Sequence, residues 1–305
     1  MAALLPEAVS PALTVVVPSV NGWGDLADCL EALEGERSDV VLEVLVPDRL
    51  GSALQAQVRS RFPWVRLLPA PAEATIPELR AVAFNAAQGE AVAVIEDHVL
   101  VPRGWARAVL AGLSGDVNVI GGAVENAATE TLVDWAAFLC EYSQLLPPLP
   151  TGRVPRITGN NTVYRRSVLE RYREAWSAGR WEDYLHEAMV QGGEALYQHP
   201  EIVVGHRKHY SVSEYAGQRF LYARSFAGAR VVDRVWGVRL MYGAAAALLP
   251  AVLLARICRT VWRKGRYRGL LIRSVPLLLL FVACWGAGEV VGYWFGAGAS
   301  LQRVK

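Results

Sequence analysis

Short apolar runs alternate with amphipathic segments along the first 125 residues of this 305-residue chain. The apolar runs predict β-strands at residues 13–18, 40–47, 65–70, 91–96 and 117–125. The amphipathic segments repeat their apolar residues at helical spacing, which predicts helices at residues 24–35, 52–62, 77–89 and 102–113. Strands that alternate with helices form βαβ units, and near-continuous Val, Ile and Leu runs are typical of strands covered on both faces. The pattern therefore predicts an α/β fold with a mostly parallel sheet flanked by helices.

The pattern becomes less regular after residue 125. Helical spacing predicts helices at residues 130–145, 167–176, 182–191 and 211–234, and the proline-rich residues 146–153 predict a loop. Residues 194–206 predict an edge strand or a hairpin, and the Gly-Asn-Asn sequence at residues 159–161 predicts a loop that leads into a helix.

Two long apolar segments occupy the C-terminal fifth, at residues 240–255 and 274–299. A helix needs about 20 apolar residues to cross the hydrocarbon core of a bilayer, so the second segment is long enough and the first is marginal. We therefore predict a membrane-associated helical hairpin at residues 236–305, following a first domain at residues 1–235. The first segment is expected to lie in the membrane plane or to be re-entrant. The alternative is a buried hairpin of a soluble domain.

Charge is nearly balanced overall, with a net charge of +2, so the sequence does not predict a nucleic-acid-binding protein. Seven basic residues and no acidic residue lie between Arg256 and Arg273, which favours an anionic membrane surface over a solvated loop.

The four cysteines are widely spaced, so we expect neither disulfides nor a zinc site, and a reducing cytosol fits. The N-terminal stretch has no basic residue before its apolar run, so we expect no signal peptide.

Three polar side chains end the predicted strand at residues 91–96 and follow it, namely Glu96, Asp97 and His98. In open α/β sheets, ligands bind at the carboxyl ends of the strands. Residues two positions apart in an extended segment project to the same side, so Glu96 and His98 predict oxygen and nitrogen ligands for a divalent ion such as Mn²⁺. Polar residues also end many strands that bind nothing.

Further candidates lie later in the chain. Glu182 and Asp183 open a predicted helix, where acidic residues also stabilise the helix dipole. His206 follows an apolar strand, a position in which a histidine is usually structural.

Five motifs in order resemble those of family 2 glycosyltransferases, which are inverting enzymes with a GT-A fold. They cover about residues 13–230 and read "VVVPSVNG", "RAVAFNAAQGEAVAVIEDHVLVPRGW", "GNNTVYRRSVLE", "WEDYLHEAMVQGG" and "VVGHRKHYSVSEYAGQRFLYARSFA". The resemblance implies a GT-A sheet with a Rossmann-like nucleotide-binding half. It also implies a nucleotide-sugar donor and a divalent metal, Mn²⁺ or Mg²⁺.

The resemblance also implies residue roles. Donor contacts would come from Pro18, Ser19, Asn21, Asp48, Arg80, Glu96 and Asp97, and metal ligands from His98, Glu96 and His206. Asp183 would be the catalytic base with Glu182 as second candidate, and Asn160 and Asn161 would lie on the acceptor side. One base on the face opposite the leaving group implies direct displacement with inversion.

The chain departs from the family pattern at three places. The metal motif ends in His98 where an Asp is usual, which puts the choice of metal in question. Pro47-Asp48 replaces a pair of acidic residues, which puts the uracil contact in question. Gln218 is followed by "RFLY" and not by the motif of processive members, which favours a single sugar addition.

The location of the C-terminal apolar segments suggests a lipid-linked or membrane-proximal acceptor, with the catalytic domain in the cytoplasm at the cell inner membrane. Two other classes of function stay open. One is a catalytically inactive, membrane-attached scaffold that binds nucleotide sugars. The other is a nucleotidyltransferase, although "PSVNGWGD" lacks the basic residue expected after the first strand of such enzymes.

Overall fold

A computed structural model describes residues 10–304 of the chain. Most of the N-terminal stretch that carries the signal-peptide argument lies outside these residues. The contacts divide the chain into two compact units. Unit 1 contains the residues up to Ala123 together with Leu149–Gly205, and unit 2 contains Val124–Pro148 together with the residues from His206 onward. The predicted boundary at residue 235 divides the chain by function and not by contacts, and it stays a prediction.

Within residues 10–304, nine strands form one sheet, ordered β3-β2-β1-β4-β8-β6-β9-β5, with β7 paired to β9. The strands are β1 (Leu13–Val16), β2 (Leu42–Asp48), β3 (Arg66–Pro69), β4 (Ala91–Ile95), β5 (Val99–Leu100), β6 (Val119–Asn126), β7 (Gly152–Arg153), β8 (Asn161–Arg165) and β9 (Leu196–His206). The five strands predicted before residue 125 are confirmed, and each end lies within two residues of its predicted position.

The prediction of a mostly parallel sheet is wrong, because the sheet is mixed. Strands β3, β2, β1 and β4 are parallel, whereas β8 pairs antiparallel with both β4 and β6. The sequence pattern predicted a loop at residues 159–161 and did not predict β8. Its sequence "NTVYR" contains the β-branched and aromatic residues that favour strands, but the strand is only five residues long and its periodicity is weak.

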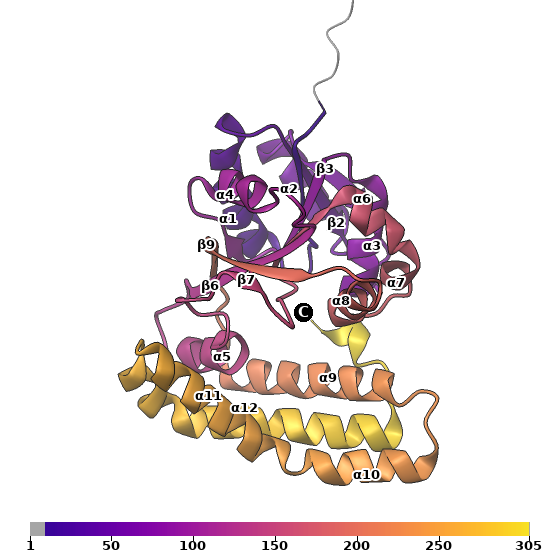
Figure 1. Cartoon of the computed structure of the whole chain (residues 1–305), viewed down its shortest axis with the longest axis vertical. Coiled ribbons are helices and arrows are strands. Elements are labelled where there is room, and N and C mark those ends of the chain that lie inside the picture. Colours follow the sequence, from indigo (N-terminus) through magenta and orange to yellow (C-terminus); the bar gives the residue numbers. More distant parts are fainter. Residues whose placement is uncertain (1–9, 305) are drawn as a thin grey trace, which may run out of the picture. The chain divides into compact units, whose positions relative to one another are not determined.

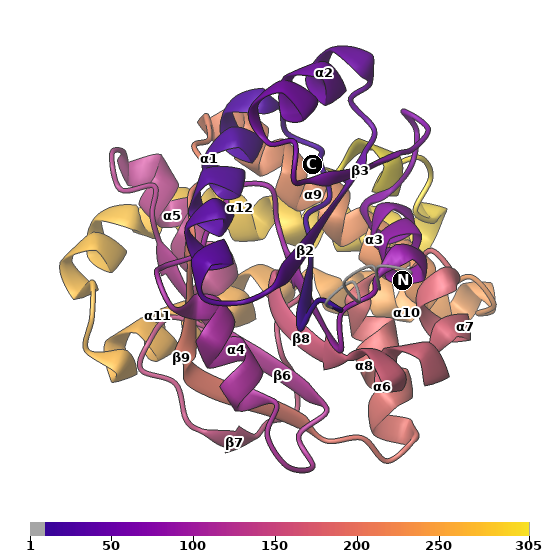
Figure 2. The same cartoon turned by 90° about the horizontal axis from the view of Figure 1, so that it is seen from above.

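Helices cover both faces of the sheet in unit 1 (Figure 2). They are α1 (Trp23–Glu34), α2 (Ser52–Arg61), α3 (Ile76–Ala86), α4 (Trp105–Gly112), α6 (Arg166–Arg171), α7 (Arg173–Ser177) and α8 (Glu182–Gln191), with a 3-10 turn at Gly35–Ser38. One core cluster joins α3, α6, α7 and α8 to the sheet through residues such as Ala83, Leu169, Trp176, Leu185 and Val94. This layer places the start of α8 beside α3.

Unit 2 is helical (Figure 1). Its described helices are α5 (Leu132–Tyr142), α9 (Val212–Arg230), α10 (Trp236–Ala246), α11 (Leu249–Lys264) and α12 (Arg268–Phe295), followed by a 3-10 turn at Leu301–Arg303. The C-terminal part therefore differs from the expected hairpin of two apolar helices. The first apolar segment is divided between α10 and α11, which meet at a bend of 47°.

Among the described residues, α12 has the length and composition to cross a membrane, and α10 and α11 pass the same criterion only when they are taken together as one bent span.

We predict that Gly122 in β6 cannot accept a side chain. A Cβ there would overlap the carbonyl oxygen of Ile202 and the side-chain amide of Asn161. Because this overlap involves backbone, we expect Gly122→Ala to lower the free energy of unfolding by about 2 kcal/mol or more, measured by urea denaturation. The matched control is Gly24→Ala in α1, where a Cβ would meet open space. Equal stability of the two variants would contradict the tight packing of β6.

Candidate functional site

A buried carboxylate joins the segments that follow β1 and β4. The Asp97 side chain is fully buried, and it accepts hydrogen bonds from the backbone N–H groups of Val20 (2.8 Å) and Asn21 (2.9 Å). The Asn21 side-chain amide donates a third bond to Asp97, with Nδ2 2.6 Å from Oδ1. Since β1 and β4 are parallel neighbours, these bonds hold two strand ends together at the ligand-binding edge of the sheet.

Asp97 also orients the ring of His98. Its Oδ1 lies 3.0 Å from His98 Nδ1, while His98 Nε2 lies 3.4 Å from Glu96 Oε2. Nδ1–H donates to Asp97 and Nε2 faces Glu96, so a divalent ion bound here would replace the proton on Nε2. Carboxylates that fix the tautomer of a ligating histidine in this way are the usual outer partners of metal sites. Asp97 thus supports the candidate ligands from behind.

Protonation equilibria in this cluster follow from burial and charge. Burial disfavours the imidazolium form of His98, but the hydrogen bonds and negative charges of Asp97 and Glu96 outweigh it and raise the pKa to about 10. Burial would raise the pKa of Asp97, yet hydrogen bonds from His98, Val20 and Asn21 lower it. A cation is therefore favoured between these carboxylates.

The Glu96–His98 pair fits a divalent ion. Two ligands about 2.1 Å from one ion and at right angles are about 3 Å apart, which is close to the 3.4 Å between Glu96 Oε2 and His98 Nε2. One carboxylate oxygen and one imidazole nitrogen suit Mn²⁺, whereas Mg²⁺ prefers oxygen ligands throughout. The donor set agrees with the predicted metal-ligand pair.

Asn160 supports Glu96 from the other side. Its Nδ2 lies 3.3 Å from Glu96 Oε2, and its Oδ1 accepts a 2.7 Å hydrogen bond from the Thr158 hydroxyl. Asn161 has a different environment, because its Nδ2 bonds to the carbonyl oxygens of Ala123 (2.9 Å) and Ile202 (3.0 Å) inside the sheet. Asn160 therefore lies beside the candidate metal ligand Glu96, whereas Asn161 is held inside the sheet, and the acceptor-side role of both residues stays a prediction.

The residues predicted to contact the donor after β1 and β2 differ in their hydrogen bonding: the Asp48 carboxylate accepts bonds from its own chain, whereas the Ser19 hydroxyl has no partner among the described residues. Asp48 is fully buried, and its oxygens accept from Leu50 N (3.1 Å), Gly51 N (3.0 Å) and Gln55 Nε2 (3.0 Å) at the start of α2. This carboxylate therefore organises the turn after β2. Pro18 and Ser19 are buried at the end of β1, and the Ser19 hydroxyl has no hydrogen-bond partner within residues 10–304.

Arg80 and Glu182 form an ion pair between α3 and α8. Arg80 is buried, and it also donates a 3.2 Å hydrogen bond to the carbonyl oxygen of Gly159. The Glu182 side chain packs directly on Gly159, where a Cβ would overlap it. The pair thus ties α3, α8 and the segment before β8 together, and the predicted donor contact of Arg80 stays a prediction.

Glu182 and Asp183 differ because of this pair. Glu182 is held in position by the buried guanidinium of Arg80. Asp183 is the next residue of α8 and is half-buried. Which of the two acidic residues is the catalytic base stays a prediction.

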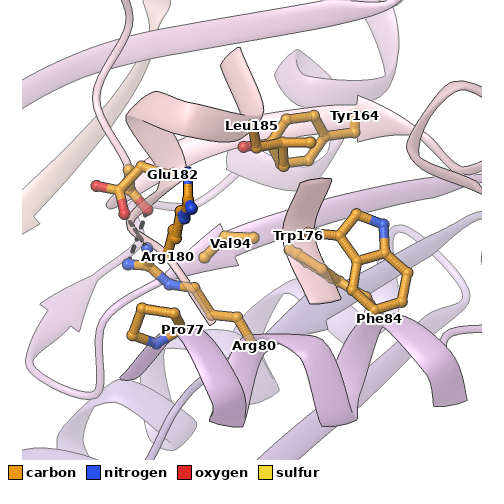
Figure 3. A pocket seen from close by; sticks show the side chains of 10 residues that line it. Pro77, Arg80, Phe84, Val94, Tyr164, Trp176, Arg180, Glu182 and Leu185 are labelled. Carbon is orange, nitrogen blue, oxygen red and sulfur yellow. Dashed lines mark hydrogen bonds and ion pairs between the residues drawn. The ribbon is translucent and has the colours of Figure 1, made fainter. Parts of the chain in front are cut away.

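A small pocket lies over the Arg80–Glu182 pair (Figure 3). Its polar wall consists of Arg80, Arg180 and Glu182, and its apolar wall includes Phe84, Trp176 and Leu185. The cavity measures about 20 Å³, enough for about one water molecule and far too small for a sugar. The pocket is therefore part of the support beneath α8 and does not itself hold a substrate.

Tyr164 and His186 form a second buried pair in this layer, which the sequence analysis missed. Tyr164 Oη lies 2.7 Å from His186 Nε2, and both side chains are almost fully buried. Burial lowers the pKa of His186 to about 4 and raises that of Tyr164, so both groups are neutral at physiological pH. The only signal in the sequence was the strand β8 itself, because the alternation of its side chains places Tyr164 on the face of the sheet that α8 covers.

His206 is the last residue of β9 and belongs to unit 2. Its ring packs on Tyr142 at a centroid distance of 4.6 Å, and its carbonyl oxygen accepts a 2.9 Å hydrogen bond from Ala127. Its role as a metal ligand stays a prediction.

Comparisons with known proteins place the fold. No protein-family model and no curated protein sequence matches the chain. Among solved structures, GalNAc-T7 with UDP, GalNAc and Mn²⁺ aligns with 66% of this chain at 14% identity and a TM-score of 0.53; the match spans 44% of the GalNAc-T7 chain.

Two further structures align over most of the chain at a TM-score of 0.49. They are the mannosyltransferase PcManGT from Pyrobaculum calidifontis with GDP-Man and Mn²⁺, at 18% identity over 89% of this chain and 86% of that one, and S. aureus TarS 1–349, at 14% identity over 92% and 90%. The GalNAc-T7 match shows that this chain has a mixed α/β fold found in glycosyltransferases.

We predict that His186 makes stability depend on pH. Its pKa of about 4 lies below the ordinary value of about 6.5, so between these values the unfolded chain binds a proton that the folded chain does not. The free energy of unfolding should fall as the pH drops from about 6.5 toward 4, by on the order of 3 kcal/mol in all. Denaturation of His186→Gln across this pH range should show a free energy of unfolding without this dependence on pH.

Tyr164→Phe is the control for this experiment. It removes the hydrogen bond to His186 but keeps the imidazole buried, so the slope should remain. A slope that is unchanged in His186→Gln would contradict a neutral buried imidazole.

Proposed function

We propose that the chain is a family 2 glycosyltransferase that moves a single sugar from a nucleotide-sugar donor to an acceptor hydroxyl or phosphate, with inversion. The observation that carries this proposal is the Glu96–His98 ligand pair, held from behind by the buried Asp97 at the adjoining ends of β1 and β4. The neighbouring folds were solved with UDP, GDP-Man or Mn²⁺, which supports a donor of this class and a divalent metal.

The donor would bind along the ends of β1, β2 and β4. Ser19 offers an unused buried hydroxyl there, while Asn21 and Asp97 hold the segment in shape. Glu96 and His98 would hold Mn²⁺ or Mg²⁺, with His206 as the proposed third ligand. When bound, such an ion neutralises charge that develops on the leaving nucleoside diphosphate.

Asp183 is the proposed general base. It would accept the proton of the acceptor hydroxyl while that oxygen forms a bond to the anomeric carbon. The bond from this carbon to the phosphate oxygen breaks on the opposite face, and its electron pair leaves with the nucleoside diphosphate. Glu182 and Arg80 would fix the first turn of α8, on which Asp183 lies.

The C-terminal helices support a membrane-proximal acceptor such as a lipid-linked phosphate or glycolipid. Large apolar side chains of α10 to α12 are exposed, among them Trp236, Met241, Val252, Ile272 and Phe295. Exposed apolar surface of this extent is typical of an interaction surface. We therefore propose that residues 236–305 associate with the inner membrane and that the catalytic residues face the cytoplasm.

Hydrolysis of a panel of nucleotide sugars by the purified full chain tests the proposal. We expect release of one nucleoside diphosphate with Mn²⁺ or Mg²⁺ and its loss in EDTA. His98→Ala and Asp183→Asn should each lower the rate by about 100-fold or more. Binding of the donor without turnover would instead support the inactive scaffold, and release of pyrophosphate from a sugar phosphate and a nucleoside triphosphate would support a nucleotidyltransferase.

Glu182→Gln separates the two acidic residues of α8. Because Glu182 is assigned to the ion pair with Arg80, we expect this variant to lose less activity than Asp183→Asn, and to lose stability as well, since it leaves a buried guanidinium without its counter-charge. Activity and urea denaturation of both variants give the comparison. A larger loss of activity in Glu182→Gln, with stability unchanged, would make Glu182 the base.

A further inference from the structure

Helices α9 and α12 pack side by side in the same chain direction (Figure 1). A Cβ at Gly288 would overlap the carbonyl oxygen of Phe220, and a Cβ at Gly292 would lie 2.6 Å from the carbonyl oxygen of Arg224. Two glycines four residues apart thus let the backbones of the helices approach closely. The long apolar helix α12 cannot be considered separately from α9.

Helix α9 is not an apolar helix. Its arginines contact α12 and the residue after it: the guanidinium of Arg219 stacks 4.1 Å from the Trp285 ring centroid, Arg224 Nε donates to Gly296 O (3.1 Å), and Arg230 lies 3.2 Å from Tyr293 Oη. If α12 crossed a bilayer with these contacts intact, the charges of α9 would enter the hydrocarbon. Each would cost about 2.5–3.5 kcal/mol at the centre of the membrane.

The exposed side of α12 is a single apolar stripe. Its exposed residues after Arg273 recur at helical spacing and carry no charge, and they include Pro276, Leu279, Leu280, Ala283, Ala287 and Phe295. The other sides of α12 pack on neighbouring helices of unit 2, with Gly286 against Pro250 and Phe281 against Tyr215. One apolar stripe along a helix that is covered elsewhere fits a position parallel to the membrane.

Helix α11 adds positive charge to an exposed apolar face. Val252, Arg256, Arg259 and Arg263 recur on its exposed side, beside Trp262, while Ile257 and Val261 are buried on the opposite side. Arginine and tryptophan together are typical of helices in the headgroup region of a bilayer. The charge of this face is complementary to anionic lipid.

We infer that α10, α11 and α12 lie in the plane of one leaflet of an anionic bilayer, and that α12 does not cross it. This inference rests on the proposed membrane association and specifies its geometry. The exposed stripe of α12 and the apolar residues of α10 enter the acyl boundary, and the arginines of α11 contact lipid phosphates. Helix α9, with its charges, stays on the aqueous side of α12.

Cysteine labelling of the full chain in sealed, inverted membrane vesicles tests this orientation. The background has Cys140, Cys258 and Cys284 replaced by alanine and keeps the buried Cys29. One reporter is Gln144→Cys, an exposed position two residues before Leu146, whose carbonyl oxygen binds Lys264 at the end of α11. The other is Gln302→Cys, an exposed position after α12.

Both reporters should react with a membrane-impermeant maleimide before the vesicles are lysed. If α12 spans the bilayer, one reporter reacts only after lysis, which would overturn the inference but leave the proposed sugar transfer intact.

Flotation of the purified full chain with phosphatidylcholine vesicles, with and without phosphatidylglycerol, tests the lipid surface. Binding should require phosphatidylglycerol, and Arg256→Gln/Arg259→Gln/Arg263→Gln should weaken it at least about tenfold. The matched control, Arg59→Gln/Arg107→Gln/Arg156→Gln, removes the same charge from exposed positions in unit 1 and should bind normally. Nucleotide-sugar hydrolysis without acceptor should be unchanged in both variants.

If vesicle binding weakened equally in both triple variants, binding would depend only on the net charge of the protein, and the proposed role of α11 would be overturned. Failure to float with either lipid, together with self-association of the chain, would make the apolar face an interface between copies. Loss of hydrolysis in the unmodified chain would contradict the proposed function and not the orientation.

Discussion

The buried carboxylate of Asp97 is the interaction on which the candidate site depends. A fully buried charge is costly unless it is paired and hydrogen-bonded, and Asp97 is satisfied by two backbone N–H groups, the Asn21 amide and the His98 ring. These bonds join the ends of two parallel strands and at the same time orient the ring of His98. One side chain therefore determines both the shape of the strand ends and the direction of the candidate metal ligand.

Buried side-chain pairs also hold helix α8 in place. Arg80 and Glu182 link α3 to α8, and Tyr164 and His186 link β8 to α8 a turn further along. Neither pair needs to touch a substrate in order to matter, because both hold the helix on which Asp183 lies. Charged and neutral pairs complement each other here: the neutral one lies deeper, where an ion would be more costly.

Hydrophobic pattern predicted the parallel half of the sheet well, since each of its strands is a short, mainly apolar run that precedes a helix. It failed at β8, which begins at the second asparagine of the Gly-Asn-Asn sequence and whose five residues carry too short a pattern to distinguish strand from loop. Local spacing likewise brought Glu96 and His98 together. It could not predict that Asp97 would point inward, that Asp48 would cap the turn before α2, or that Arg80 would pair with Glu182, because these depend on residues 3 to 102 positions away.

The glycine contacts between α9 and α12 bear on where the chain can be divided. A truncation at residue 235, which composition suggests as a boundary, would remove α12 and leave Ala223 and Ala227, now fully buried, facing solvent. The arginines of α9 would lose the Trp285 ring and the Gly296 carbonyl at the same time. The apolar C-terminal segment is thus the folding partner of a polar helix, and the proposed membrane contact is better altered by changing the exposed stripe of α12 than by deleting the helix.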